Sequence, residues 1–215
     1  MIPVLVIGKS GAGKSFSAVG LPTEGTVVIN VLGKPLPFKS HLKTVKCSDY
    51  KKIKAAISKG GYSRYVIDDF GYLMTDQFMS ALSARGKGGD VFQYYTDIGL
   101  TLWDFIKSLL DNPSDSRVYL LMHEEQDDYG NIKPRAFGKL VEQKVCLEGM
   151  VTICLRAAVD SEQRHIFITQ SDGMDTAKSP LGLFDSAHID NDLGLVDKAI
   201  VEYYDIKEEN EHEAN

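Results

Sequence analysis

The first sixteen residues constrain the fold of this chain more than any other stretch. Residues 4–7 are a short apolar run rich in β-branched side chains, as in a strand buried on both faces. Residues 8–15 follow at once and read Gly-Lys-Ser-Gly-Ala-Gly-Lys-Ser, which matches G-x-x-x-x-G-K-S in full. Residues 16–19 can begin a helix. A strand, a glycine-rich loop and a helix start in this order predict a phosphate-binding turn; the alternative is a glycine-rich turn that matches by chance.

The chemistry of an anion site explains this spacing. Glycines let the backbone adopt positive φ and approach a ligand closely, and successive N–H groups at a helix N-terminus then converge on an anion. Lys14 can reach the β- and γ-phosphates of a nucleotide, and the Ser15 hydroxyl can bind Mg²⁺. The expected contacts to a nucleoside triphosphate are Gly8, Lys9, Ser10, Gly11, Ala12, Gly13, Lys14, Ser15 and Phe16.

Strand-like and helix-like segments alternate along the rest of the chain. Strands are expected at 27–31, 65–69 and 117–122, and helices at 50–58, 71–82 and 94–110. Further strands are expected at 150–155 and 165–169, a short helix at 139–146, a helix or strand at 193–204, and loops at 32–43, 84–90, 126–138 and 171–180. This order predicts an α/β fold with a mostly parallel sheet, helices on both faces and a C-terminal antiparallel hairpin.

Acidic residues end two of these strands, at the edge of a parallel sheet where ligands bind. Asp68 is a candidate Mg²⁺ ligand, against the alternative of an ordinary strand-end acid. Asp69 could orient or deprotonate an attacking water, or could cap the next helix. The sequence His-Glu-Glu at 123–125 could sense a γ-phosphate, and Glu124 could activate water; the alternative is a solvated strand end.

Two polar loops carry cations that could bind nucleic acid. The cations are Arg85 and Lys87 in loop 84–90, and Lys133 and Arg135 in loop 126–138. Cations neutralise phosphates, and the rings of Tyr129 and Phe137 in the second loop could stack on unpaired bases. The alternative is two ordinary mobile surface loops.

These motifs together resemble the RecA-like ATPase core of the P-loop NTPases. The closer likeness is to small phage-encoded ATP-binding proteins, core-only RecA relatives described as Sak-type single-strand annealing proteins. The resemblance runs over roughly residues 2–204 and rests on segments 8–15, 65–69, 123–125 with 130–138, and Asp-Thr-Ala-Lys-Ser-Pro at 175–180. The first motif is specific to P-loop NTPases in general, and the looser later ones favour the subfamily.

The resemblance implies an Mg²⁺-dependent ATPase that binds single-stranded DNA and promotes annealing or homologous recombination in phage replication. It places the DNA-facing loops at 84–90 and 126–138, and at Lys178 a lysine that reaches the γ-phosphate of a neighbouring subunit in a ring or filament. It also implies a single-strand DNA-binding protein as a partner and the cytoplasm of a bacterial host as the location.

One departure from the RecA pattern concerns catalysis. RecA proteins carry a catalytic glutamate just after the second strand, and this chain has Asn30, Val31 and Leu32 there. Hydrolysis then uses another carboxylate, Asp69 or Glu124, or is slow. Two other functions remain open: a small-molecule or nucleotide P-loop kinase, and a nucleotide-gated DNA loader or scaffold with negligible hydrolysis.

Composition separates the end of the chain from the rest. Residues 202–215 hold six acidic residues and one lysine, and so carry −5 of the net charge of −6. We expect a core at 1–204 and an acidic, disordered tail at 205–215, which either mimics DNA or only adds solubility. The three cysteines lack metal-type spacing, which favours a reducing cytoplasm, and no apolar run approaches the ~20 residues that span a membrane.

Overall fold

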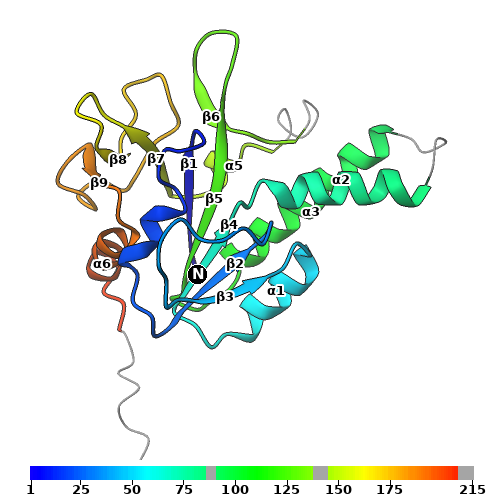
Figure 1. The fold of residues 1–215 in the computed structure, drawn as a ribbon, viewed down its shortest axis with the longest axis horizontal. Helices are drawn as coiled ribbons and strands as arrows, with labels where there is room; N and C mark the ends of the chain where they lie inside the picture. Colours follow the sequence, from blue (N-terminus) through cyan, green and yellow to red (C-terminus); the bar gives the residue numbers. More distant parts are fainter. Residues whose placement is uncertain (86–90, 138–144, 208–215) are drawn as a thin grey trace, which may run out of the picture.

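The computed structural model describes residues 1–85, 91–137 and 145–207, which form an α/β fold around one mixed sheet (Figure 1). Within these residues the sheet has nine strands, in the order β3-β2-β4-β5-β1-β7-β8-β9, with β6 paired to β5. The strands are β1 Ile2–Gly8, β2 Thr26–Asn30, β3 Lys43–Lys46, β4 Arg64–Asp68, β5 Arg117–Gln126, β6 Ile132–Pro134, β7 Ile153–Val159, β8 His165–Ile168 and β9 His188–Asp190. Neighbours from β3 to β7 are parallel, whereas β6, β8 and β9 pair antiparallel. The mostly parallel sheet with antiparallel C-terminal strands is confirmed.

β1 lies in the middle of the sheet because its side chains are apolar on both faces. Residues 4–7 are at most 1% exposed, as expected of a strand covered on both sides. Gly8 at its end pairs in register with His123 of β5 and Ala157 of β7. The residues that follow β1, β4 and β5 therefore meet at one edge of the sheet, the carboxyl edge.

Helices cover both faces of the sheet, as predicted (Figure 1). The helices are α1 Tyr50–Lys59, α2 Tyr72–Arg85, α3 Val91–Leu110, α5 Leu147–Met150 and α6 Leu193–Tyr203, with a 3-10 helix, η1, at Phe16–Gly20. Side chains of α1, α2 and α3 pack with Leu5 and Ile7 in one apolar cluster. Those of η1 and α6 pack with Val4 and Val6 in the other.

The helix after the phosphate-binding turn is shorter than a full α-helix. It ends at Gly20, and Leu21 is already extended with φ −72° and ψ 141°. Pro22 explains this end, because the residue before a proline is disfavoured in the α region and glycine is a poor helix former. The same glycine lets the start of α6 approach closely, since a Cβ at Gly20 would overlap the side chain of Asp192.

Three strands, β3, β6 and β9, are absent from the sequence prediction, and a fourth, β5, is longer than predicted. β3 overlaps the predicted loop 32–43 and continues to Lys46; all four of its residues are exposed, as in a lysine-rich edge strand without an apolar pattern. β9 pairs with β8 beyond the predicted hairpin. β5 continues through Gln126 and forms a hairpin with β6 inside the predicted loop 126–138. The turn of this hairpin is stabilised by the carboxylate of Asp127, which accepts the N–H groups of Tyr129 and Asn131.

The helical segments also differ at some ends. α2 continues through Arg85, so loop 84–90 begins later than predicted, and residues 86–90 lie outside the described residues. The helix predicted at 139–146 falls mostly on residues outside the described part, and the described helix there is α5. Segment 193–204, open between helix and strand, is the helix α6, capped by the side chain of Asp192. In the described part of the chain, no helix combines the length and the apolar character needed to cross a membrane.

Candidate functional site

The phosphate-binding turn joins β1 to η1 at the carboxyl edge of the sheet. Gly11 and Gly13 have φ values of 81° and 96°, the left-handed region that glycine adopts without strain. A Cβ at Gly13 would also lie 2.8 Å from Oδ1 of Asn191 and 2.9 Å from Nδ1 of His165. The glycines thus have a conformational reason and, at Gly13, a steric one. Lys9, Ser10, Gly11 and Phe16 are exposed, Gly13 and Ser15 are half-buried, and Gly8, Ala12 and Lys14 are buried.

Lys14 lies folded over its own turn. Its Nζ donates to the carbonyl oxygens of Gly8 at 2.7 Å and Lys9 at 2.8 Å. Burial lowers the pKa of Lys14, and the nearby charges of Asp69, Glu124 and Asp68 oppose that shift. An ammonium has three donors, so one N–H remains to bind an anion in the turn.

Ser15 and Asp68 meet although they are 53 residues apart. The Ser15 hydroxyl donates to Oδ1 of Asp68 at 2.7 Å. Asp68 ends β4, and β5 separates that strand from β1. Burial raises the pKa of Asp68, against the Ser15 hydrogen bond that lowers it. A hydroxyl and a carboxylate that share one point beside a phosphate-binding turn are suited to a hard cation such as Mg²⁺.

The carboxylate of Asp69 forms an ion pair with Lys34, and its backbone carbonyl accepts the N–H of Tyr72 at the start of α2, at 2.9 Å. Its backbone has φ 63°, an uncommon conformation for a residue with a side chain. Its Oδ2 lies 2.5 Å from Nζ of Lys34, and the carboxylate is 7% exposed. Among the nearby acids, Asp69 contributes most to opposing the low pKa of Lys14. The charge of Asp69 therefore acts on the lysine of the phosphate-binding turn.

Asn30, the last residue of β2, shapes the loop that presents Lys34. Its Nδ2 donates to the carbonyl of Lys34 at 2.6 Å, and its Oδ1 accepts the N–H of Gly33 at 2.6 Å. Both ends of the amide are engaged with the backbone. Asn30 thus has a structural role in the loop after β2.

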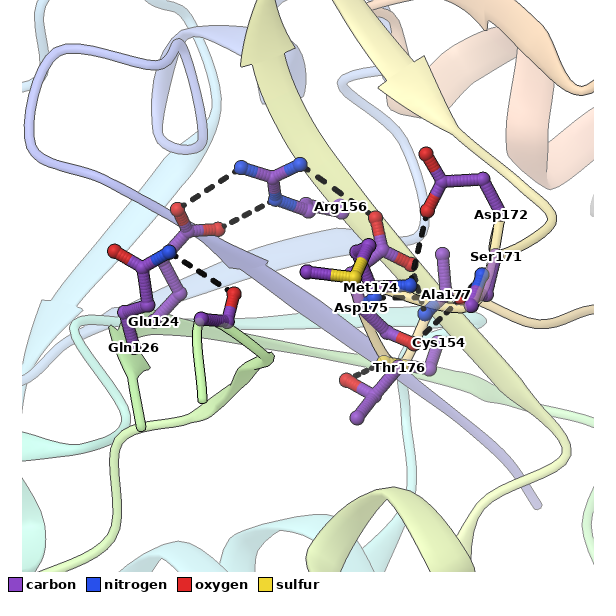
Figure 2. Close-up of polar contacts among 12 residues, drawn as sticks. Glu124, Gln126, Cys154, Arg156, Ser171, Asp172, Met174, Asp175, Thr176 and Ala177 are labelled. Carbon is purple, nitrogen blue, oxygen red and sulfur yellow. Dashed lines mark hydrogen bonds and ion pairs between the residues drawn. The ribbon is translucent and has the colours of Figure 1, made fainter. Parts of the chain in front are cut away.

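Glu124 lies inside β5 and binds Arg156 of β7 (Figure 2). The guanidinium donates through Nε and Nη2 to both carboxylate oxygens, at 2.9 and 3.2 Å. Its Nη1 lies 3.5 Å from Oδ2 of Asp175, and the side chains of Glu124 and Asp175 are only 3% and 4% exposed. The alternative of a solvated strand end does not hold for Glu124, because Arg156 binds it, largely away from water, together with a second carboxylate.

The two neighbours of Glu124 have separate partners. The ring of His123 packs edge-on against Tyr72 at a centroid distance of 6.0 Å. Burial, together with the charge of Lys14, lowers the pKa of His123, so the imidazole is neutral at pH 7. Glu125 pairs with Lys133 across the hairpin at 3.2 Å.

Two of the four candidate DNA-binding cations lie together beside this edge. Lys133 is in β6, and the exposed Arg135 follows that strand. The N–H of Arg135 donates to the carbonyl of His123 at 2.8 Å, so the hairpin returns directly onto the site. Arg85 is the last residue of α2. Lys87 lies outside the described residues.

Lys178 is not brought to the phosphate-binding turn of its own chain. Its backbone pairs with Cys154 in two hydrogen bonds of 2.8 Å. Cys154 is in register with Leu5, which precedes Gly8 by three residues or about 10 Å of strand. A role for Lys178 at a phosphate would therefore belong to a neighbouring subunit.

Four residues of this region were missed by the sequence analysis. Arg156 was the most visible, as a lone charge in an apolar strand. Lys34, His165 and Asn191 had no signal, because loops and strand ends often carry such residues. Asn191 is 7% exposed, and neither polar atom of its side chain has a hydrogen-bond partner in the described structure.

Comparison with protein-family models and with curated proteins finds no match to this sequence. The described residues hold no cluster of three or more His, Cys, Asp or Glu side chains that could bind a metal by themselves. A metal ion here would rely on Ser15, Asp68 and phosphate oxygens, as Mg²⁺ with a nucleotide does.

Proposed function

We propose that this protein is an Mg²⁺-dependent ATPase that binds single-stranded DNA and promotes annealing or homologous recombination. The observation that carries the ATPase part is the hydrogen bond between Ser15 and Asp68, with Lys14 beside it. It joins the phosphate-binding turn to the strand-end acid expected of a P-loop NTPase. The order of the strands supports the interpretation as a RecA-like ATPase core, because β5 lies between β1, which ends at the turn, and β4, which ends at Asp68.

The residues at the edge have complementary roles towards a nucleotide. Backbone N–H groups of residues 11–15 and the ammonium of Lys14 bind the β- and γ-phosphates. Ser15 and Asp68 would hold Mg²⁺, which supplies positive charge to the phosphate oxygens when bound. Asp69 is the favoured carboxylate to orient the attacking water and take its proton, since its partner Lys34 is largely exposed, whereas Arg156 binds both oxygens of Glu124.

The hairpin β5–β6 supports the DNA-binding part. It begins at Glu124, returns to His123 through the backbone of Arg135, and carries two cations and the exposed ring of Tyr129, which is 88% exposed. Cations with an exposed aromatic ring can bind the backbone and bases of a single strand.

A second candidate is a nucleotide-gated DNA loader or scaffold with negligible hydrolysis. The observation that favours it is Asn30, whose amide binds backbone and supplies no carboxylate where RecA proteins have their glutamate. Such a protein would bind ATP and DNA but release phosphate no faster than the background.

The test is the rate of ATP hydrolysis with and without single-stranded DNA, for the wild type, Lys14→Ala and Lys9→Ala. Lys9 is an exposed lysine in the same turn, so it controls for the lost charge. We expect DNA-stimulated turnover in the wild type and Lys9→Ala, and none in folded Lys14→Ala. ATP and DNA binding without turnover would favour the scaffold, and phosphate transfer to a small molecule without DNA would favour the kinase. Full turnover by Lys14→Ala would exclude the site.

Self-association with ATP between subunits also belongs to this proposal. The position of Lys178, away from the turn of its own chain, fits a contact to a neighbour. The cytoplasm of a bacterial host, a single-strand DNA-binding protein as partner and the role of the tail remain predictions from the sequence.

A further inference from the structure

One guanidinium connects the nucleotide edge of the sheet to two surface segments. Arg156 is in register with Ile7, next to the phosphate-binding turn. It binds Glu124, the first paired residue of hairpin β5–β6, and Asp175, in the loop that follows β8 (Figure 2). The side chain of Arg156 is 19% exposed, so these contacts lie largely away from water.

The loop that contains Asp175 is attached to the same hairpin at a second point. The N–H of Ile132, in β6, donates to the carbonyl of Met174 at 2.8 Å. The other carboxylate oxygen of Asp175 accepts the N–H of Ala177 at 3.0 Å. The Ser171 hydroxyl donates to the backbone carbonyl of Asp175 at 2.6 Å, so hydrogen bonds within the loop stabilise its conformation. The hairpin is therefore held at its base by Glu124 and on β6 by Met174. Arg156 connects these two contacts, because it binds both Glu124 and Asp175, the neighbour of Met174.

The ion cluster of Arg156, Glu124 and Asp175 lies beside the strand that ends in the phosphate-binding turn. Glu124 is near enough to Lys14 for its charge to act on that ammonium. Arg156 binds two buried carboxylates, so the three side chains together carry a net charge of −1. A triphosphate with Mg²⁺ in the turn would add net negative charge near this cluster, and charge interactions are strong where water is excluded.

We propose that Arg156 is a positioning residue that couples nucleotide occupancy to DNA binding by hairpin β5–β6, through its contacts with Glu124 and Asp175. This rests on the proposed function, because it takes the hairpin as the DNA surface and the turn as the ATP site. Nucleotide binding shifts the balance between Arg156 and its two carboxylates, and the hairpin that they support moves with them. Linkage makes the effect reciprocal: DNA changes nucleotide affinity by the factor by which nucleotide changes DNA affinity.

The experiment measures four dissociation constants for each variant: oligo(dT) with and without a non-hydrolysable ATP analogue and Mg²⁺, and the analogue with and without oligo(dT). We expect a coupling factor of at least ~5 in the wild type, within the usual range for allosteric proteins. In Arg156→Gln each ligand should still bind alone, and the factor should fall to within about twofold of one. A purely structural role would weaken both affinities and leave their ratio intact.

Milder variants decide the matter where Arg156→Gln does not fold. Arg156→Lys keeps the charge but loses the fork, so it should retain part of the coupling. Asp175→Asn keeps the acceptor for Ala177 and weakens only one arm, and should lower the coupling with basal turnover unchanged. Arg164→Gln, on an exposed arginine, is the control and should behave as the wild type. Wild-type coupling that persists in both milder variants would overturn the inference, as would a factor of one in a wild type that binds both ligands. A wild type that binds neither ligand would overturn the proposed function.

Discussion

At the scale of single residues, Asp69 carries the clearest catalytic prediction. It is buried, has a positive φ, pairs with Lys34, and its charge acts on Lys14. Asp69→Asn keeps the shape and removes the base, so turnover should fall by roughly a hundredfold or more while the affinity for ATP changes little. Steady-state hydrolysis and nucleotide titration measure the two effects.

Two controls separate the base from its surroundings. Lys34→Gln removes the partner and keeps the carboxylate, and we expect only a modest loss of turnover. Glu124→Gln tests the other carboxylate. If Glu124→Gln is inactive and Asp69→Asn turns over normally, the role of base belongs to Glu124.

The turn offers a matched pair of glycines for a stability test. Gly11 and Gly13 both have positive φ, but a Cβ at Gly11 meets nothing within 4 Å, whereas one at Gly13 meets Asn191 and His165. Gly11→Ala should cost about 1–2 kcal/mol from conformation alone. Gly13→Ala should cost more and should also weaken nucleotide binding, because the turn must shift. Equal unfolding free energies in urea for the two variants would contradict the steric account.

At the scale of elements, the hairpin β5–β6 predicts a salt-dependent loss of DNA affinity. Arg135 is exposed, whereas Lys133 shares its charge with Glu125. Arg135→Gln should therefore weaken binding to oligo(dT) more than Lys133→Gln does. A lost phosphate contact should reduce the slope of log affinity against log salt by about 0.7 for a single strand.

The control for the hairpin is Lys59→Gln, an exposed lysine at the end of α1. Lys59→Gln changes the net charge by the same amount as Arg135→Gln. Lys59 ends α1, whereas the start of that helix lies at the carboxyl edge of the sheet. If it lowers the affinity as much as Arg135→Gln, the effect comes from overall charge and the hairpin has no specific role.

The elements also show where a sequence pattern suffices. β1 and β4 were predictable because parallel strands buried on both faces form continuous apolar runs. β3 was not, since a lysine-rich edge strand has no apolar period. β6 was not, because its three residues pair only through a turn that Asp127 stabilises.

The candidate site follows the same division. Lys14, Ser15 and Asp68 could be predicted together, because a local motif and the common edge of parallel strands bring them into contact. The pairing of Glu124 with Arg156 and Asp175 could not. It depends on the order of β5, β1 and β7 in the sheet and on the path of the loop after β8, neither of which has a local signature.

At the scale of the whole molecule, a buried ion cluster lies at the start of β4 and β5, the opposite edge from the turn. Asp197 of α6 accepts from Arg64, Arg117 and Tyr119, and its side chain is 4% exposed. The start of α6 packs against η1, where a Cβ at Gly194 would overlap the backbone of Gly20. α6 therefore joins the end of η1 to this cluster.

The cluster predicts how stability depends on pH. Burial by itself would raise the pKa of Asp197, but the hydrogen bonds and charges of Arg117, Tyr119 and Arg64 outweigh it and hold that pKa below its ordinary value of 3.8. A carboxylate with a lowered folded pKa stabilises the fold at neutral pH, and this contribution is lost as pH falls from the ordinary value through the folded one. Asp197→Asn should therefore lower the unfolding free energy at pH 7 by about 3–5 kcal/mol, because buried arginines lose their counter-charge. Urea unfolding at several pH values should show that the difference in unfolding free energy from the wild type narrows below about pH 4.

Asp111→Asn, in an exposed pair with Lys107, is the control and should change stability by less than about 0.5 kcal/mol. A difference between wild type and Asp197→Asn that stays constant from pH 7 to pH 2 would contradict the prediction, because stability would then not depend on the charge of this carboxylate.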